Sequence, residues 1–294
     1  MQLGLSAKRK IIIVGFLIVP VILLLLFCYY PALKLLQYSF TSWDGISPTL
    51  TYIGLKNYTR VFTDSRYYTP FLHNGILFIA GLVQILLAFY LAIILNNRLL
   101  RGRNAFRSLI FMPYILNSVA IAFIFSFFLD PNSGVLNSLI RNIGFPNFNV
   151  DWFGNAAIVN WVMGFIALWK YTGYMMIIFL GALQSVPLDL YEASYIDGAN
   201  AFQQMRFITL PSIRNIVGII FFLNLNGVVG AFEFQFIMWP MSSPLGIADT
   251  FMTKTVGTAF NAGKYGLASS MGVILVVIVG VITVVQNKLI MRED

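Results

Sequence analysis

The chain has 294 residues, of which 59% are hydrophobic and only 10% are charged, and its formal net charge is +8. An ordinary soluble domain carries about 25% charged residues, so this chain has too few charges to cover a water-exposed surface. Its large apolar fraction excludes intrinsic disorder as well. Because it has one cysteine and one histidine, the chain also lacks a disulfide framework and a Cys/His zinc cluster, and we expect no metal site.

Six apolar segments are long enough to cross a bilayer, which takes about 20 mainly apolar residues of helix. They span residues 11–30, 71–95, 109–129, 157–180, 216–232 and 267–285. Their apolar runs are continuous rather than alternating, which favours helices over the strands of a membrane barrel. We therefore predict an all-α fold, a polytopic membrane helix bundle with six transmembrane helices in a single transmembrane domain over residues 1–294.

The distribution of basic residues predicts the orientation of this bundle. With both termini in the cytoplasm, the inner segments carry eleven of the 19 Lys and Arg residues and the outer loops carry seven, while Lys170 lies within the fourth span. The basic pI of about 9.6 is then a consequence of topology. We do not expect nucleic acid as a partner, because no soluble domain is present to bind it.

Residues 184–213, between the fourth and fifth spans, are too ordered for a passive connection. Pro187 predicts the start of a short helix, and Gly198 permits a sharp bend after it. A second apolar stretch covers residues 202–208 before Pro211, where we expect the helix to end. The residues alone leave two interpretations open, an amphipathic helix lying on the membrane and a docking helix for a cytoplasmic partner.

The same loop resembles a family signature, EAA-x3-G-x9-I-x-LP, which marks the membrane-spanning subunits of binding-protein-dependent ABC importers. The matching residues are Glu192-Ala193-Ser194, Gly198 and Ile208-Thr209-Leu210-Pro211, with Ser194 in place of the second alanine. Residues 52–58 and 265–272 are similar to segments of the carbohydrate-uptake branch, in particular of its maltose-type first permease subunit. Ser242-Ser243-Pro244 departs from the Gly-Gly-Pro of many sugar permeases, which affects the expected shape of the last outer loop only.

The resemblance implies partners for the chain. It implies a second permease subunit in a heterodimer, two cytoplasmic ATPase subunits, an extracytoplasmic solute-binding protein and a bacterial or archaeal plasma membrane as the location. It also assigns the contact with the ATPase to Glu192, Ala193, Ser194, Asp197, Gly198, Ala199, Ile208, Leu210 and Pro211. No Walker A motif surrounds Gly263-Lys264, because Thr258 and Tyr265 occupy its required glycine and Ser/Thr positions. We therefore expect no catalytic residue and no cofactor on this chain, and ATP and Mg bound by the partner subunits.

Polar residues inside the spans are costly, so they face either a partner helix or an aqueous path. The candidates for a substrate path are Asn160, Trp169, Lys170, Tyr171, Tyr174, Asn224, Asn226 and Glu233. Asn160, Tyr171 and Tyr174 share one helical stripe, and Asn226 and Glu233 share another. Amide groups and aromatic rings suit the hydroxyls and C–H faces of sugars, but hydrogen bonds between helices would use the same residues.

Lys170 has three possible uses: it could reach the membrane interface, pair with Glu233 or meet an anionic substrate. The function we expect is ATP-driven import of a sugar or oligosaccharide. The alternative is the same permease role for a sugar phosphate, glycerol phosphate or another polar solute. An ion-coupled secondary transporter is a remote alternative, because no acidic residue lies deep in a span.

Overall fold

The computed structural model describes residues 5–97, 99–240 and 242–289, and within these residues the chain is helical, with no β-strand. Five helices in this part of the chain are long and apolar enough to cross a membrane, or six if one sharply bent pair counts as a span. The prediction of an all-α membrane helix bundle is confirmed.

The first span is a continuous helical rod. It consists of α1 (Leu5–Leu24), a π-helical turn (Leu25–Tyr29) and α2 (Tyr30–Ser39). We expected this span to end at residue 30, and that boundary is wrong because Pro31 does not end the helix. A proline lacks an N–H and its ring clashes with the carbonyl four residues earlier in an α-helix. Here the N–H of Tyr30 bonds to the oxygen of Leu25, five residues earlier, so a wider turn precedes the proline and the rod continues.

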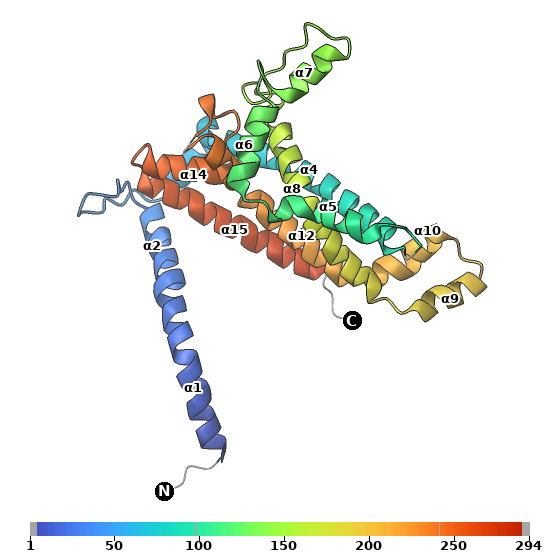
Figure 1. Ribbon diagram of the computed structural model, residues 1–294. Coiled ribbons are helices and arrows are strands. Elements are labelled where there is room, and N and C mark those ends of the chain that lie inside the picture. The colour runs from blue at the N-terminus through green and yellow to red at the C-terminus, as the bar shows by residue number, and fades with distance from the viewer. Residues whose placement is uncertain (1–4, 98, 241, 290–294) are drawn as a thin grey trace.

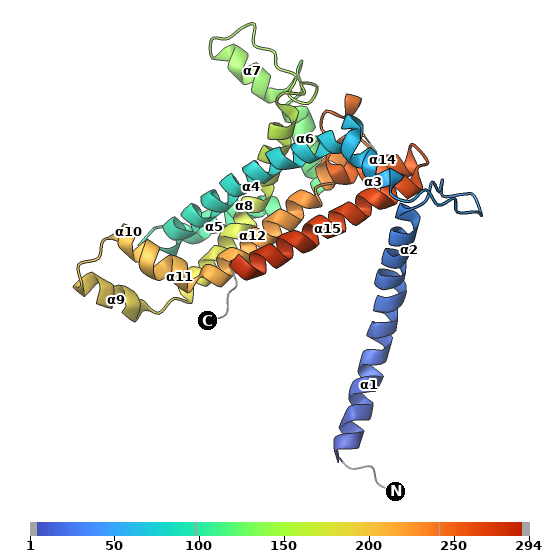
Figure 2. The ribbon, with the colours of Figure 1, turned by 180° about the vertical axis from the view of Figure 1, so that it is seen from behind.

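The remaining helices form the bundle shown in Figure 1. In chain order they are α3 (Lys56–Thr63), α4 (Ser65–Asn96), α5 (Arg103–Ile115), α6 (Ser118–Phe128), α7 (Val135–Asn142), α8 (Val159–Gln184), α9 (Leu188–Ile196), α10 (Ala201–Gln204), α11 (Leu210–Ser212), α12 (Arg214–Val229), α13 (Glu233–Met238), α14 (Phe251–Phe260) and α15 (Tyr265–Leu289). In Figures 1 and 2, α9 and α10 extend from one end of the bundle and α7 from the other. The rod of α1 and α2 packs on α15 through α2 and then diverges from the bundle.

The third span is broken, so the prediction of one continuous helix over residues 109–129 is wrong. Helices α5 and α6 meet at an angle of 97°. Asn117 has an extended backbone at this point, with φ −63° and ψ 135°, and its side chain accepts a hydrogen bond from the N–H of Val119. This side chain therefore caps a new helix. The apolar run had hidden the break, because Leu116 and Ser118 fit an apolar helix as well as a helix end.

The fifth span is interrupted too. We expected one helix over residues 216–232, but α12 ends at Val229 and α13 begins at Glu233. The N–H of Gly230 returns to the oxygen of Asn226, which closes the last turn of α12. Phe232 has φ −145° and ψ −39°, outside helical geometry. Three non-helical residues thus separate α12 from α13, although Arg214–Met238 still forms one candidate span.

Helices α4, α5 and α8 approach one another through small residues. A Cβ atom built on Gly173 of α8 would lie 2.1 Å from the backbone oxygen of Ile110 in α5, and one on Gly164 would lie 2.8 Å from the side chain of Ala80 in α4. Without a hydrophobic driving force between helices in lipid, close backbone packing of this kind holds the bundle together. The α4–α8 contact therefore forms a rigid centre beside which the other helices are placed.

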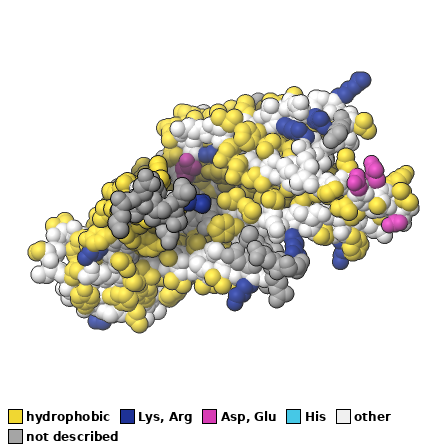
Figure 3. All heavy atoms as spheres, turned by 90° about the horizontal axis from the view of Figure 1, so that it is seen from below, with side chains coloured by type: hydrophobic (Ala, Val, Ile, Leu, Met, Phe, Trp, Pro, Cys, Tyr) yellow, Lys and Arg dark blue, Asp and Glu magenta, His cyan; other side chains and the backbone are white. Residues whose placement is uncertain are grey.

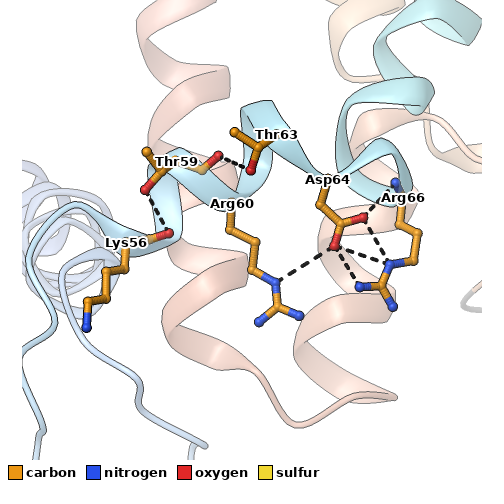
Figure 4. A network of polar contacts seen from close by, with 6 residues as sticks. All are labelled: Lys56, Thr59, Arg60, Thr63, Asp64 and Arg66. Carbon is orange, nitrogen blue, oxygen red and sulfur yellow. Dashed lines mark hydrogen bonds and ion pairs between the residues drawn. The ribbon is translucent and has the colours of Figure 1, made fainter.

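The corner between α3 and α4 is held by one carboxylate (Figure 4). Asp64 accepts hydrogen bonds from the backbone N–H and the guanidinium of Arg66, with Nη2 2.7 Å from Oδ2, and Arg60 lies 4.0 Å away. Lys56 points away from this network (Figure 4). The hydrogen bond from the Arg66 side chain lowers the pKa of Asp64 to about 2, so the cap at the start of α4 stays ionised at any ordinary pH.

Replacing Gly173 with alanine should destabilise the bundle, because the new methyl group meets backbone rather than a movable side chain. Overpacking of a close contact costs about 1–3 kcal/mol, so we expect a lower midpoint of thermal unfolding for the purified protein in detergent. Gly181 is the matched control, since it lies in the same helix and a Cβ there meets no atom within 4 Å. Equal midpoints for Gly173→Ala and Gly181→Ala would contradict the close-packing account.

Candidate functional site

A cavity of about 400 Å³ lies beside the end of α5 and the interruption between α12 and α13. Helices α4, α5, α8, α12 and α13 line it, together with the non-helical residues between α12 and α13. The polar or aromatic residues of the lining are Gln84, Tyr114, Tyr171, Tyr174, Asn224, Phe232, Glu233, Phe234 and Gln235. Gly227 borders open space in this lining, since a Cβ there would meet no atom within 4 Å, whereas Gly81 and Gly164 lie where the helices pack closely.

Three tyrosines form an aromatic group at this cavity. Tyr114, near the end of α5, stacks on Tyr174 of α8 with ring centroids 4.6 Å apart and planes 15° from parallel. Tyr171, one turn earlier in α8, meets Tyr114 edge-on at 6.1 Å. The break after α5 ends that helix beside α8 and so places Tyr114 in this group. Rings of this kind offer flat apolar faces with hydroxyl groups at their edges.

Two buried amides of the lining have unpaired polar atoms. Gln84 of α4 is 4% exposed and Asn224 of α12 is 6% exposed. The Nε2 donor of Gln84 and the Oδ1 acceptor of Asn224 have no hydrogen-bond partner among the described residues. Buried polar groups are nearly always paired, so two orphaned atoms at one cavity are unusual, and both are covered by neighbouring side chains in this conformation.

Lys170 lies behind the cavity rather than in its lining. Its side chain is 8% exposed, its Nζ is 3.6 Å from Oε2 of Glu233, and it also donates a hydrogen bond to Oγ of Ser118. The hydroxyl of Tyr171 donates to the same carboxylate oxygen at 3.3 Å. The pairing of Lys170 with Glu233 that the sequence suggested is therefore confirmed. Pairing of this kind offsets the cost of a lysine within a span.

The other polar candidates do not reach the cavity. Asn160 is 2% exposed and donates to the backbone oxygen of Ile247, in the loop between α13 and α14, at 2.8 Å. Asn226 donates to the oxygen of Phe222 in its own helix, and Trp169 packs edge-on against the ring of Phe125. The structure thus brings together Tyr171, Tyr174, Asn224 and Glu233 of the candidates.

Sequence reasoning missed Gln84, Tyr114 and Gln235. Gln84 had a usable signal, since it is an amide in the middle of the second apolar run. Tyr114 and Gln235 had none, because their positions at the cavity depend on the two helix breaks. Among the residues that the structure describes, no group of three or more His, Cys, Asp or Glu side chains is placed to hold a metal ion.

The second part of the candidate site is the loop after α8, where α9 ends in a glycine turn. Gly198 has φ +80°, in the left-handed region that glycine adopts without strain. Its N–H bonds to the oxygen of Tyr195, and the N–H of Ala199 bonds to the oxygen of Ser194. This pair of bonds is a Schellman motif, which closes the helix and turns the chain. A Cβ atom at Gly198 would meet no atom within 4 Å. Glycine is therefore favoured here by the positive φ angle and not by lack of room for a side chain.

Side chains tie α9 to the segment that follows it. The hydroxyl groups of Tyr191 and Thr209 are 2.9 Å apart, and Gln204 donates to Oγ of Ser194 at 3.0 Å. Pro211 does not end the helix as we expected. A π-helical turn (Met205–Thr209) precedes it, and α11 continues to Ser212. A π-helical turn also precedes the proline of α2.

The outer surface of α9 has no partner within the described residues. No residue of α9 is buried, and Tyr195 and Ile196 are 78% and 85% exposed. Glu192 and Asp197 are exposed beside them. Figure 3 shows hydrophobic side chains over much of the face seen from below and acidic side chains gathered at the end where α9 lies. This short helix therefore presents apolar and acidic groups together.

Comparison with known proteins identifies the family. Residues 84–292 match the family described as "Binding-protein-dependent transport system inner membrane component". The chain belongs to this family. Its relatives include the arabinooligosaccharides transport system permease protein AraP of Bacillus subtilis, 30% identical over 90% of this chain and 84% of that protein. Another is the probable ABC transporter permease protein PH1215 of Pyrococcus horikoshii, 31% identical over 77% of both chains.

A solved structure shares the fold. It is a bacterial ABC transporter involved in the import of the acidic polysaccharide alginate, and one chain of it matches with a TM-score of 0.84 over 98% of both chains. The sequence identity is 24%, so this likeness concerns the fold. Membership of the permease family makes the chain a non-catalytic, multi-pass membrane subunit of a binding-protein-dependent transport system. This membership disfavours the ion-coupled alternative.

The hydrogen bond from Asn160 to Ile247 should hold the loop between α13 and α14 of this permease in place. We expect Asn160→Leu to leave the oxygen of Ile247 unpaired and to raise amide hydrogen exchange over residues 243–250 by about five-fold, as the loss of about 1 kcal/mol would. Asn226→Leu is the control, because the Asn226 amide bonds only within α12. Unchanged exchange in Asn160→Leu would show that this bond does not anchor the loop.

Proposed function

We propose that this permease forms, with a second permease subunit, the translocation path for a sugar or oligosaccharide delivered by an extracytoplasmic binding protein. ATP hydrolysis in two cytoplasmic partner subunits drives the transport. The observation that carries the proposal is the cavity between the two broken spans, with its stacked tyrosines and unpaired amides. Transport proteins commonly place their substrate sites at discontinuous helices of this kind.

The chemistry of the cavity fits a saccharide. A sugar ring offers a weakly apolar C–H face that suits the rings of Tyr114 and Tyr174, and hydroxyl groups that both donate and accept. The names of several relatives also refer to the transport of saccharides. They include AraP, the multiple sugar-binding transport system permease protein MsmF of Streptococcus mutans and the diacetylchitobiose uptake system permease protein NgcF of Streptomyces coelicolor. MsmF is 29% identical over 93% of both chains.

The uncovered surface of α9 supports contact with an ATPase subunit. A monomer in water rarely leaves adjacent large apolar side chains such as Tyr195 and Ile196 uncovered without a partner for them. Acidic Glu192 suits a basic group on that partner. The loop joins α8, which lines the cavity, to α12 through short connections and the Tyr191–Thr209 contact. Movement of a docked α9 would therefore be passed to two helices of the cavity.

The diverging rod supports a second permease subunit. No residue in the most apolar window of Ile12–Ser39 is buried, and the rod stands apart from the bundle in Figures 1 and 2. A related permease subunit would fill the space between the rod and the bundle, as a heterodimer of the maltose type requires. Lipid would cover the remaining apolar surface.

The arrangement of the loops supports a cytoplasmic position for both termini. The start of α5, the α9–α11 segment and the end of α15 lie at one end of the bundle in Figures 1 and 2. Arg101, Arg103, Arg107, Arg206 and Lys288 lie in or directly beside these segments, and basic residues mark the cytoplasmic side. The outer loops around α7 and α14 lie at the opposite end.

Purification of the tagged permease from its native membrane tests the proposal. We expect ATPase subunits and a second permease subunit to co-purify, and mass spectrometry of the solute on the co-purifying binding protein to identify a saccharide. A non-carbohydrate solute would contradict the cargo, and an assembly without an ATPase would contradict the driving force.

Glu192→Lys should abolish transport, because a lysine would meet the basic group that we expect on the ATPase. Glu192→Gln keeps the size and removes the charge, so a partial loss is expected there. The measurement is ATP hydrolysis stimulated by the loaded binding protein in proteoliposomes, with the yield of assembled complex as the folding control. Normal stimulated hydrolysis in Glu192→Lys would count against docking through this acid.

Gly198 allows a test of the α9 turn that separates backbone conformation from space. Asparagine tolerates positive φ better than other side chains, whereas valine is strongly disfavoured there. We expect Gly198→Val to uncouple ATP hydrolysis from transport and Gly198→Asn to retain much of the coupling. Equal behaviour of the two variants would show that the left-handed conformation is not what coupling needs.

A further inference from the structure

We propose that the cavity selects uncharged saccharides over acidic ones, with Glu233 as the specificity-determining residue and Lys170 as its positioning residue. The inference rests on the proposed function of sugar import and names the substrate class for the same cavity. It is carried by the charges and exposures of the lining.

The lining carries one charged side chain and it is acidic. Among the described residues that line the cavity, Glu233 is the one Asp or Glu residue, and no lysine, arginine or histidine is present. Its side chain is 54% exposed, so the carboxylate faces the space that a ligand would occupy. A carboxylate or phosphate on the ligand would meet this charge, and the lining offers no free cation to pair with the ligand, because Lys170 is already paired with Glu233. Such a like-charge contact is a common way to reject a wrong partner.

Lys170 is not free to receive an anion. Its Nζ is held between Oγ of Ser118 and Oε2 of Glu233, and it lies 5.1 Å and 5.3 Å from the ring centres of Tyr171 and Phe234. To reach a ligand, it would have to leave the ion pair and expose a buried ammonium group. The lysine that could have indicated an acidic cargo therefore serves to hold Glu233 in place.

The free carboxylate oxygen of Glu233 calls for a hydrogen-bond donor on the ligand. Both contacts that the described residues make with the Glu233 carboxylate involve Oε2, which leaves Oε1 to accept a bond from a ligand. A hydroxyl group of the ligand can donate this bond, whereas an ionised carboxylate can only accept. The unpaired atoms of Gln84 and Asn224 are themselves buried, so a ligand does not reach them in this conformation.

The fold itself does not decide the charge of the cargo. The structural neighbour with TM-score 0.84 is described as importing an acidic polysaccharide, although its chain superposes on nearly the whole of this one. Two permeases of one fold can therefore differ in cargo charge through the residues that line the path. In this chain the lining points to uncharged saccharides.

Saccharide binding to the purified full assembly tests the inference. The binding protein is omitted, so that its own selectivity does not enter, and saturation-transfer NMR detects weak binding. The probes are two matched pairs, cellobiose with cellobiouronic acid and xylobiose with the aldobiouronic acid of glucuronate and xylose. We expect the neutral member of at least one pair to bind about tenfold or more tightly than its acidic counterpart.

The variants separate charge from fold. Glu233→Gln should bring the neutral-to-acidic affinity ratio close to one, because the repulsive charge is gone while the shape remains. Lys170→Met should raise the neutral-to-acidic affinity ratio, since Glu233 loses its counter-ion. Lys170→Arg keeps the positive charge, so the ratio should stay at the value of the unchanged protein. A lysine with a merely structural role would lower the binding of both members equally.

The outcomes also distinguish this inference from the proposed function. Binding of the acidic member as tight as that of the neutral one, or an unchanged ratio in Glu233→Gln, would overturn the inference and leave sugar import intact. Binding of none of the four saccharides would overturn the sugar-import proposal itself and the inference with it.

Discussion

A helix inside a membrane can break only where its freed backbone groups find partners in the protein or in a water-filled space. This constraint connects the main features of the bundle. The span of α5 and α6 is bent by 97°, the span of α12 and α13 is interrupted by three non-helical residues, and the cavity lies beside both interruptions. Tyr114 comes from the end of one broken helix and Glu233 from the start of another. The side chain of Asn117 and the turn at Gly230 satisfy the backbone groups that the breaks release.

The unbroken helices provide the rigid part of the molecule. Close packing of α4 on α8 through Gly164, and of α5 on α8 through Gly173, leaves little freedom for these helices to slide. Helix α8 carries Tyr171 and Tyr174 at the cavity and ends four residues before α9. In the proposed mechanism, this rigid connection lets movement of a docked α9 open and close the path. Two prolines, Pro31 and Pro211, sit in otherwise continuous helical stretches because a π turn precedes each of them.

Much of this architecture could be predicted from the sequence, because the strongest signals in it are local. Continuous apolar runs indicate the spans, and Gly198 after a short helix indicates the turn that the structure shows. The partnership of Lys170 with Glu233 also followed from the cost of an unpaired charge in lipid. The helix break at Asn117 could not be predicted from the sequence. An asparagine inside an apolar run is as compatible with an interhelical hydrogen bond as with a helix cap. The positions of Tyr114 and Gln235 depend on that break and its counterpart before Glu233, so no local pattern could reveal them. Asn160 was assigned to the path by its helical stripe, but its partner, Ile247, lies 87 residues away in the sequence.

The central claim is that the cavity at the two helix breaks holds the transported solute. An experimental structure of the complete assembly, arrested with nucleotide while its binding protein hands over the solute, tests this most directly. The account predicts density for one saccharide packed against the stacked pair of Tyr114 and Tyr174, with a hydroxyl group within hydrogen-bond distance of Glu233. Solute found elsewhere along the path, with this cavity closed by its own side chains, would contradict it.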